Sequence, residues 1–126
     1  MVAADTELAI IELFFHKEEL LPLWLRFRPA VEALGHDVRV RPRGRYVEFD
    51  RGGLMFVIAE PTADHELEVG LHNPGLPFDE RFREAVGFGS RRITHRVSLP
   101  EDGEIDADLH ARLHGAYELA REGEPR

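Results

Sequence analysis

The chain contains no cysteine, so it can form no disulfide bond, no thiolate metal site and no cysteine nucleophile. It also lacks long hydrophobic runs, because the longest purely apolar segment, "LMFVIA" (54–59), is far too short to cross a bilayer. The start, "MVAADTELAI", has Asp5 and Glu7 where a secretory signal would carry positive charge. We therefore expect a cytoplasmic protein with no membrane partner.

Positive charge is scarce in this sequence. Lysine and arginine together number 16 against 24 aspartate and glutamate residues, which gives a formal net charge of −8. Such a balance argues against non-specific binding to duplex nucleic acid, which depends on neutralising phosphates. The positive charge is concentrated in residues 37–59 and 91–99, however, and a local basic patch can attract an anion.

Motifs of the common enzyme classes are also missing. The segment "RGGLMF" (51–56) lacks the Gly-Lys-Ser/Thr end of a P-loop, and "GFGS" (87–90) does not match the nucleophile elbow G-x-S-x-G. In "HARLH" (110–114) two histidines are one helical turn apart, but the glutamate of a metalloprotease does not follow His110. We therefore expect His110 and His114 on a solvated helix edge, and we predict no catalytic motif, cofactor or metal.

The remaining pattern predicts one domain over residues 1–126. Apolar residues recur at the helical period over about 5–34, about 78–87 and about 104–122. The period changes to two over about 37–72, where short turns predict an antiparallel meander, and again over 91–99. We predict an α+β fold with a predominantly antiparallel five-stranded sheet. The N-terminal helices, one short helix and a C-terminal helix should pack on one face of that sheet.

With these elements placed, several segments occur in an order typical of one bacterial family: "FFHKEELLPLW", "RGRYVEFDRGG", "LEVGL", "DERFREA", "RRITHRVSL" and "LHGAYELA". Over nearly its whole length the chain resembles the domain of unknown function 5655 family. More distantly it is similar to the YjbR-like family, whose fold has been likened to a double-wing nucleic-acid-binding domain. The resemblance implies no catalytic residues and mildly favours a binding module.

His95 is the first candidate for a functional side chain. It lies in the predicted strand 91–99, on the apolar face that includes Ile93. A buried neutral imidazole there could simply donate a hydrogen bond to a carbonyl or to Tyr117, or it could act as a general base near Tyr46 or a carboxylate. We favour the structural role, and we treat Tyr46, His95 and Tyr117 as candidate pocket residues.

Arginines form the stronger candidate surface. The two-residue period puts a pair of them on one face of the first predicted strand and another pair on one face of the last. If these strands lie near one another, the guanidinium groups would gather, with Arg43 extending the patch at a turn, and could bind carboxylate or phosphate. The alternative is that acids such as Glu48 and Glu68 pair with them across strands. The candidate ligand-binding residues are Arg39, Arg41, Arg45, Arg92 and Arg96.

Three functions are compatible with these features. The first is a non-enzymatic binding module that presents the arginine-lined face to an anionic ligand, a nucleic acid or an acidic partner. The second is a protein–protein or homodimerisation module that uses an exposed apolar face. The third, which we consider weakest, is a small enzyme that uses His95. We favour the first.

Overall fold

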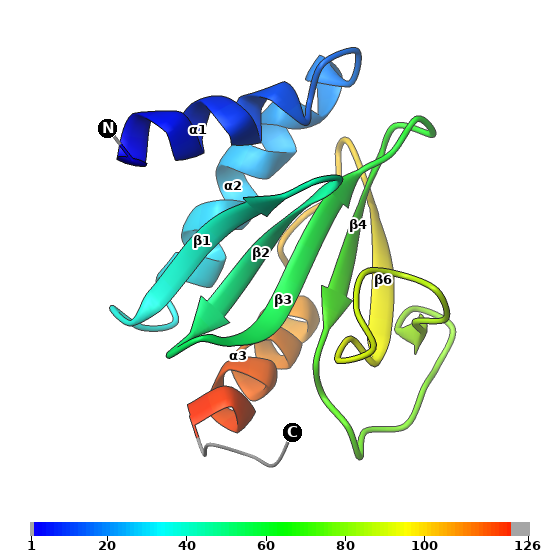
Figure 1. The fold of residues 1–126 in the computed structure, drawn as a ribbon. Coiled ribbons are helices and arrows are strands. Elements are labelled where there is room, and N and C mark those ends of the chain that lie inside the picture. The colour runs from blue at the N-terminus through cyan, green and yellow to red at the C-terminus, as the bar shows by residue number, and fades with distance from the viewer. Residues whose placement is uncertain (1, 122–126) are drawn as a thin grey trace.

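Three α-helices and six strands make up the part of the chain that the structure, a computed structural model, describes, namely residues 2–121 (Figure 1). The helices are α1 (Val2–Glu12), α2 (Leu21–Glu32) and α3 (Ala107–Arg121), and a short 3₁₀ helix, η1 (Glu18–Leu20), precedes α2. The strands are β1 (Val38–Arg43), β2 (Tyr46–Arg51), β3 (Leu54–Pro61), β4 (Glu66–Leu71), β5 (Arg83–Glu84) and β6 (His95–Pro100). The predicted α+β class is confirmed.

All strands pair antiparallel in one sheet with the order β1-β2-β3-β4-β6-β5. The first four strands form the predicted meander. Two-residue turns join β1 to β2 and β2 to β3, and Gly44 and Gly52 in these turns have φ of +43° and +59°, which side chains rarely tolerate. The sheet has six strands rather than five, because the two-residue strand β5 adds to its far edge.

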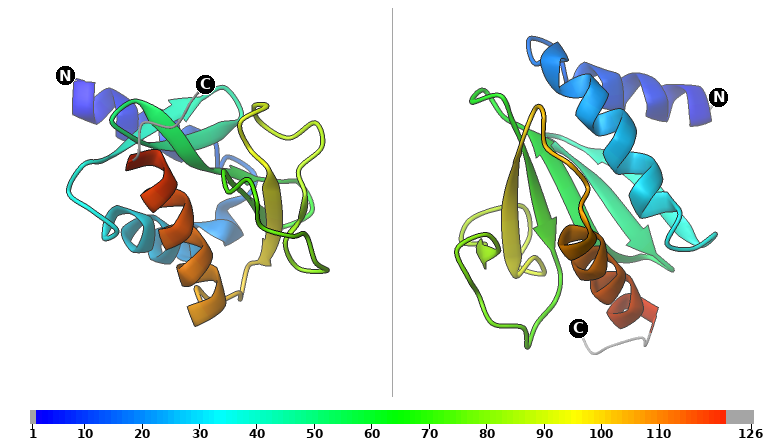
Figure 2. Two further views of the ribbon diagram at one scale, coloured as in Figure 1. Left: turned by 90° about the horizontal axis from the view of Figure 1, so that it is seen from below. Right: turned by 180° about the vertical axis from the view of Figure 1, so that it is seen from behind.

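The helices cover one face of this sheet, and the main core lies between them (Figure 2). Four rings from the N-terminal region and β2 meet there, with centroids 5.7–6.3 Å apart: Phe14, Trp24, Phe27 and Phe49. Pro22 lies in the first turn of α2, where its missing N–H would have no partner within the helix. The apolar residues that recur at the helical period in this segment face the sheet, as predicted. Residue 122 of the expected last helix lies outside the described residues.

A loop from β4 to β6 lies over the opposite face, which we call the outer face (Figure 1). Phe88 and Ile93 of this loop form a second small cluster with Ile58 of β3. Gly70, the cross-strand partner of Ile58, makes room for them, since a Cβ there would come within 2.9 Å of all three side chains. The central strand β3 is thus buried on both faces, as its continuous apolar run predicts.

The prediction of a short helix over 78–87 is wrong. Residues 78–82 are irregular, and Arg83–Glu84 form strand β5. The Asp79 carboxylate accepts the N–H groups of Arg81 and Phe82, which closes a tight turn in place of a helical one. Phe82 is fully buried in the core, so one tertiary anchor outweighs the local helical spacing.

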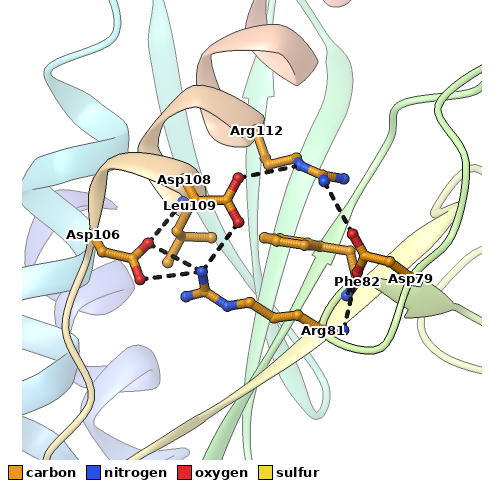
Figure 3. A network of polar contacts seen from close by, with 7 residues as sticks. All are labelled: Asp79, Arg81, Phe82, Asp106, Asp108, Leu109 and Arg112. Atoms are coloured by element: carbon orange, nitrogen blue, oxygen red, sulfur yellow. Dashed lines mark hydrogen bonds and ion pairs between the residues drawn. The ribbon is translucent and has the colours of Figure 1, made fainter.

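Ion pairs attach this turn to the start of α3 (Figure 3). Arg81 contacts Asp106 and Asp108 at 3.1 and 3.2 Å, and Arg112 contacts Asp79 at 3.3 Å. The ring of Phe82 lies between the two guanidinium groups, whose Cζ atoms are 5.2 and 4.1 Å from the ring centroid. These arginines therefore hold the loop in place.

The last strand is also shorter than predicted over 91–99, because β6 begins only at His95. Ile93 precedes the strand and packs on the outer face, whereas Val97 and Leu99 belong to the main core. Ile93 therefore does not share a face with them. The N–H of Ile93 donates to the Ser90 carbonyl in a turn, which reverses the side-chain direction expected from simple alternation.

Candidate functional site

The outer face carries most of the charged side chains of the sheet. Arginines project from the edge strand β1, and acids from β2 and β3 lie beside them. We define the arginine row as Arg39, Arg41, Arg43 and Arg45, three from β1 and one from the following turn, all exposed.

Two members of the arginine row lie on top of buried carboxylates. Arg41 Nε is 3.2 Å from Asp50 Oδ2, and Arg43 Nε donates to Glu48 Oε1 at 3.0 Å. The two arginine side chains are 52% and 51% exposed, whereas those of Asp50 and Glu48 are 1% and 8% exposed. The Glu48 carboxylate raises the pKa of Arg43. Each arginine is therefore held through Nε, and among residues 2–121 neither uses its terminal nitrogens in a hydrogen bond.

The Arg41–Asp50 contact differs from the Arg43–Glu48 contact. Its atoms are near enough for an ion pair, but they are not aligned for a hydrogen bond, and Asp50 Oδ2 makes none with the described residues. Asp50 Oδ1 accepts the N–H of Gly53 at 3.4 Å. The buried charge of Asp50 thus depends mainly on the Coulomb attraction of Arg41.

The other two members of the row are held more loosely. Arg45 is 85% exposed, and its Nε is 3.9 Å from Glu60 Oε2. Arg39 donates from Nη1 to the carbonyls of His36 and Val38, each at 3.3 Å. These two side chains can be replaced without stranding a buried acid.

The remaining predicted arginines, Arg92 and Arg96, do not join the row. Three strands separate β1 from β6. At about 4.8 Å for each of the four intervals, these two strands lie about 19 Å apart. Arg96 donates twice to Glu68 at 3.0 and 2.8 Å and lies over the ring of Phe88. Arg92 Nε donates to the carbonyl of Met55 at 2.7 Å. The predicted single patch is thus divided into two groups by strand order.

The three candidate pocket residues also lie apart. Tyr46 packs at the margin of the Ile58 cluster on the outer face, whereas Tyr117 lies on the helix side of the sheet. His95 is 1% exposed and contacts the ring of Phe78 at 4.6 Å. No shared pocket forms from these described side chains.

Both ring nitrogens of His95 have internal partners. Nε2 is 3.1 Å from the Leu76 carbonyl, which can only accept, so this nitrogen carries a hydrogen. Nδ1 lies 2.7 Å from the Thr94 hydroxyl, which itself donates to the Leu71 carbonyl at 3.2 Å. An imidazole whose two ring nitrogens both have internal partners fits the structural role.

Tyr117 belongs to a polar cluster, which we call the Tyr117 clasp. Its hydroxyl donates to Asp37 Oδ1 at 2.6 Å, and Arg51 donates to Asp37 Oδ2 at 2.8 Å while lying over the tyrosine ring. Hydrogen bonds from Tyr117 and then Arg51 lower the pKa of Asp37 to about 2. Gly35 permits the approach, since a Cβ there would be 1.9 Å from the Tyr117 oxygen.

The outer face also has a hollow that the sequence analysis missed. It has a volume of about 350 Å³ and is lined by Ala85, Gly87, Phe88, Gly89, Ser90, Arg91 and Ile93. The glycine spacing in "GFGS" is the signal in the sequence for a loop of this kind, since both glycines have positive φ. The hollow depends on loop conformation, which strand and helix periods do not describe.

Within residues 2–121, no group of three or more histidine or acidic side chains is placed to hold a metal ion. None of the helices in that range combines the length and apolar character needed to cross a membrane. His114 lies 3.6 Å from Glu118, one turn along α3.

A family model described as "Domain of unknown function (DUF5655)" matches residues 12–120. No curated protein and no solved structure matches the chain. The more distant similarity to the YjbR-like family is not shown.

We predict that Arg41→Ala lowers the free energy of unfolding by about 1–3 kcal/mol, because Asp50 would keep a buried charge without its partner. The half-exposed position of Arg41 keeps this below the cost of breaking a fully buried pair. Chemical denaturation measures the change. Arg45→Ala, which leaves only the partly exposed Glu60, should change stability by less than about 0.5 kcal/mol. Adding Asp50→Asn to Arg41→Ala should restore part of the loss; no restoration would contradict the explanation.

We predict that the Tyr117 clasp makes stability depend on pH in the acid range. The folded pKa of Asp37 is depressed, so its contribution is present above about pH 4 and is lost as the pH falls toward about 2. The melting temperature of wild type should therefore fall more steeply across this window than that of Asp37→Asn. Asp102→Asn, in an exposed turn, serves as control and should follow wild type. Parallel curves for wild type and Asp37→Asn would contradict the prediction.

Proposed function

The chain belongs to the DUF5655 family, whose description assigns no activity, and from the geometry of its outer face we propose a non-enzymatic binding module whose arginine row recognises an acidic protein segment. The observation that carries this proposal is the arrangement of exposed guanidinium groups above buried carboxylates along β1.

The arginine row places guanidinium groups at regular intervals along β1. Successive members on β1 are two residues apart, or about 6.8 Å along the strand. Glu48 and Asp50 hold two of the guanidinium groups in place before any ligand arrives, so less side-chain entropy is lost on binding. The terminal nitrogens left over can donate in pairs to carboxylate groups.

Charge favours an acidic protein segment over nucleic acid. Three of the four arginines have an acid within 4 Å, so the row carries little excess positive charge. The whole chain has a net charge of −8, which opposes the approach of a dense phosphate backbone. Short-range hydrogen bonds to separated carboxylates do not need a strong long-range field.

The backbone of β1 favours recognition through side chains rather than addition of a strand. The two-residue turn between β1 and β2 fixes which residue pairs exchange hydrogen bonds. The backbone polar groups of Val38, Val40 and Pro42 therefore face away from β2. Pro42 has no N–H, and the N–H of Val38 is bonded to the Gly35 carbonyl. Within β1 this leaves Val40 as the one outward donor, too few for a ladder.

The test is binding of a fluorescent glutamate-rich peptide to wild type and to Arg39→Ala/Arg45→Ala, measured by anisotropy. These two arginines can be removed without stranding a buried acid, and losing their charge-assisted hydrogen bonds should weaken binding at least about tenfold. Arg26→Ala/Arg83→Ala, which removes two exposed arginines of α2 and β5, carries the same charge change and should bind like wild type.

Equal losses in both double variants would mean that only net charge matters, and would overturn the proposal. Tighter binding of single-stranded DNA than of the peptide, with the same dependence on Arg39 and Arg45, would assign the row to nucleic acid instead.

A second candidate function, association through α1, is favoured by one observation. Leu8 and Ile11 of α1 and Phe15 in the turn that follows it are 60%, 48% and 59% exposed. We predict that the wild type forms a concentration-dependent dimer in sedimentation equilibrium and that Ile11→Glu abolishes it, because a charge cannot be buried unpaired. Val86→Glu, at an apolar residue 72% exposed elsewhere, is the control and should still dimerise. A wild type that stays monomeric at every concentration would contradict this candidate.

A further inference from the structure

The hollow on the outer face is lined by a loop with backbone N–H groups that lack partners among the described residues. Five consecutive N–H groups, from Gly87 to Arg91, make no hydrogen bond with any group of residues 2–121. The neighbouring N–H groups of Val86, Arg92 and Ile93 are all bonded internally. Gly87, Gly89 and Arg91 are exposed, so this unbroken run of donors beside the hollow is accessible to a ligand.

The backbone of this run alternates in the sign of φ. Gly87 and Gly89 have φ of +66° and +68°, while the residues between and after them keep negative values. Such alternation is typical of the concave anion-binding arrangement known as a nest, in which successive N–H groups turn toward one side. A Cβ at Gly87 would meet nothing within 4 Å, so backbone conformation rather than crowding accounts for that glycine.

Side chains fix the loop in this conformation. Phe88 is 7% exposed, packs on Ile58 and lies beneath the guanidinium of Arg96, whose Cζ is 4.5 Å from its ring centroid. Ser90 accepts the N–H of Arg92 through its hydroxyl, at 3.1 Å. The donors are thus held in place without a ligand, which lowers the entropy lost on binding.

The residues that line the hollow carry positive charge and no negative charge. Arg91 is exposed and is the charged residue among those that line the hollow; the others are small, apolar or hydroxyl-bearing. We propose that residues 87–91 form a binding site for the phosphate group of a small phosphomonoester, with the N–H groups donating to the phosphate oxygens and Arg91 balancing their charge.

The size of the hollow favours an organic phosphate over the bare ion. About 350 Å³ is at the lower end of the range for small-molecule pockets and leaves room beside a phosphate group. Ala85 and Ile93, which also line the hollow, would contact an apolar substituent. The site does not depend on the arginine row, which lies on β1 and the turn that follows it.

The test is a titration of ¹⁵N-labelled protein with phenyl phosphate, and separately with inorganic phosphate, followed by amide chemical shifts. The amides of residues 87–91 should shift saturably with both ligands, and phenyl phosphate should bind more tightly. Arg91→Ala should weaken binding about tenfold or more, as loss of a charge-assisted hydrogen bond predicts. Arg39→Ala/Arg45→Ala should retain wild-type affinity, which separates this site from the proposed function.

A matched glycine pair tests the backbone. Gly87→Ala strains a left-handed residue inside the run of donors and should weaken binding. Gly52→Ala introduces the same strain in the β2–β3 turn, where φ is +59° and the space is equally open, and should leave binding unchanged. Saturable shifts confined to residues 39–45, or no saturable shift with either ligand, would overturn the proposal. Equal affinity of the two ligands would assign the site to free phosphate rather than to a phosphomonoester.

Discussion

The contact of Phe88 and Ile93 with Ile58, which Gly70 makes possible, determines how the outer face is used. A Cβ at position 70 would come within 2.9 Å of all three side chains, so the loop lies flat on the sheet only above a glycine. Once seated, the loop buries the second face of β3 and forms the wall of the hollow. Both proposed binding surfaces exist because this loop covers the middle of the sheet and leaves its β1 side open.

Local periodicity was sufficient for the elements whose own apolar pattern matches the face that they bury. The meander, the buried run 54–59 and the last helix follow from alternation, turn residues and an apolar stripe. It failed over 78–87, where "FDERFREA" has helical spacing but Phe82 is drawn into the core and Asp79 closes a turn. Those interactions depend on α3, which lies more than 20 residues later.

The site was predictable in kind but not in arrangement. Alternating arginines and acids on predicted strands indicated both a binding surface and cross-strand pairing, and the structure contains both features in layers: Asp50 and Glu48 are buried, and the guanidinium groups lie above them. Which strands are neighbours could not be deduced from a period of two, so the expected joining of Arg41 with Arg96 had no physical basis in the sequence. For backbone donors such as those of residues 87–91, the glycine spacing is the sole trace in the sequence, because an N–H group has the same chemistry in every residue but proline.

The Tyr117 clasp has a consequence for how the protein is made. It joins Asp37 to a tyrosine 80 positions later, and that tyrosine also packs against Phe56 in the middle of the sheet. During synthesis the meander can pair in order while the N-terminal helices cover part of its apolar face, but the part beneath α3 stays open until residues 107–121 have also emerged. The clasp therefore forms after the meander, and it fastens the first strand of the sheet to the helix that covers its middle.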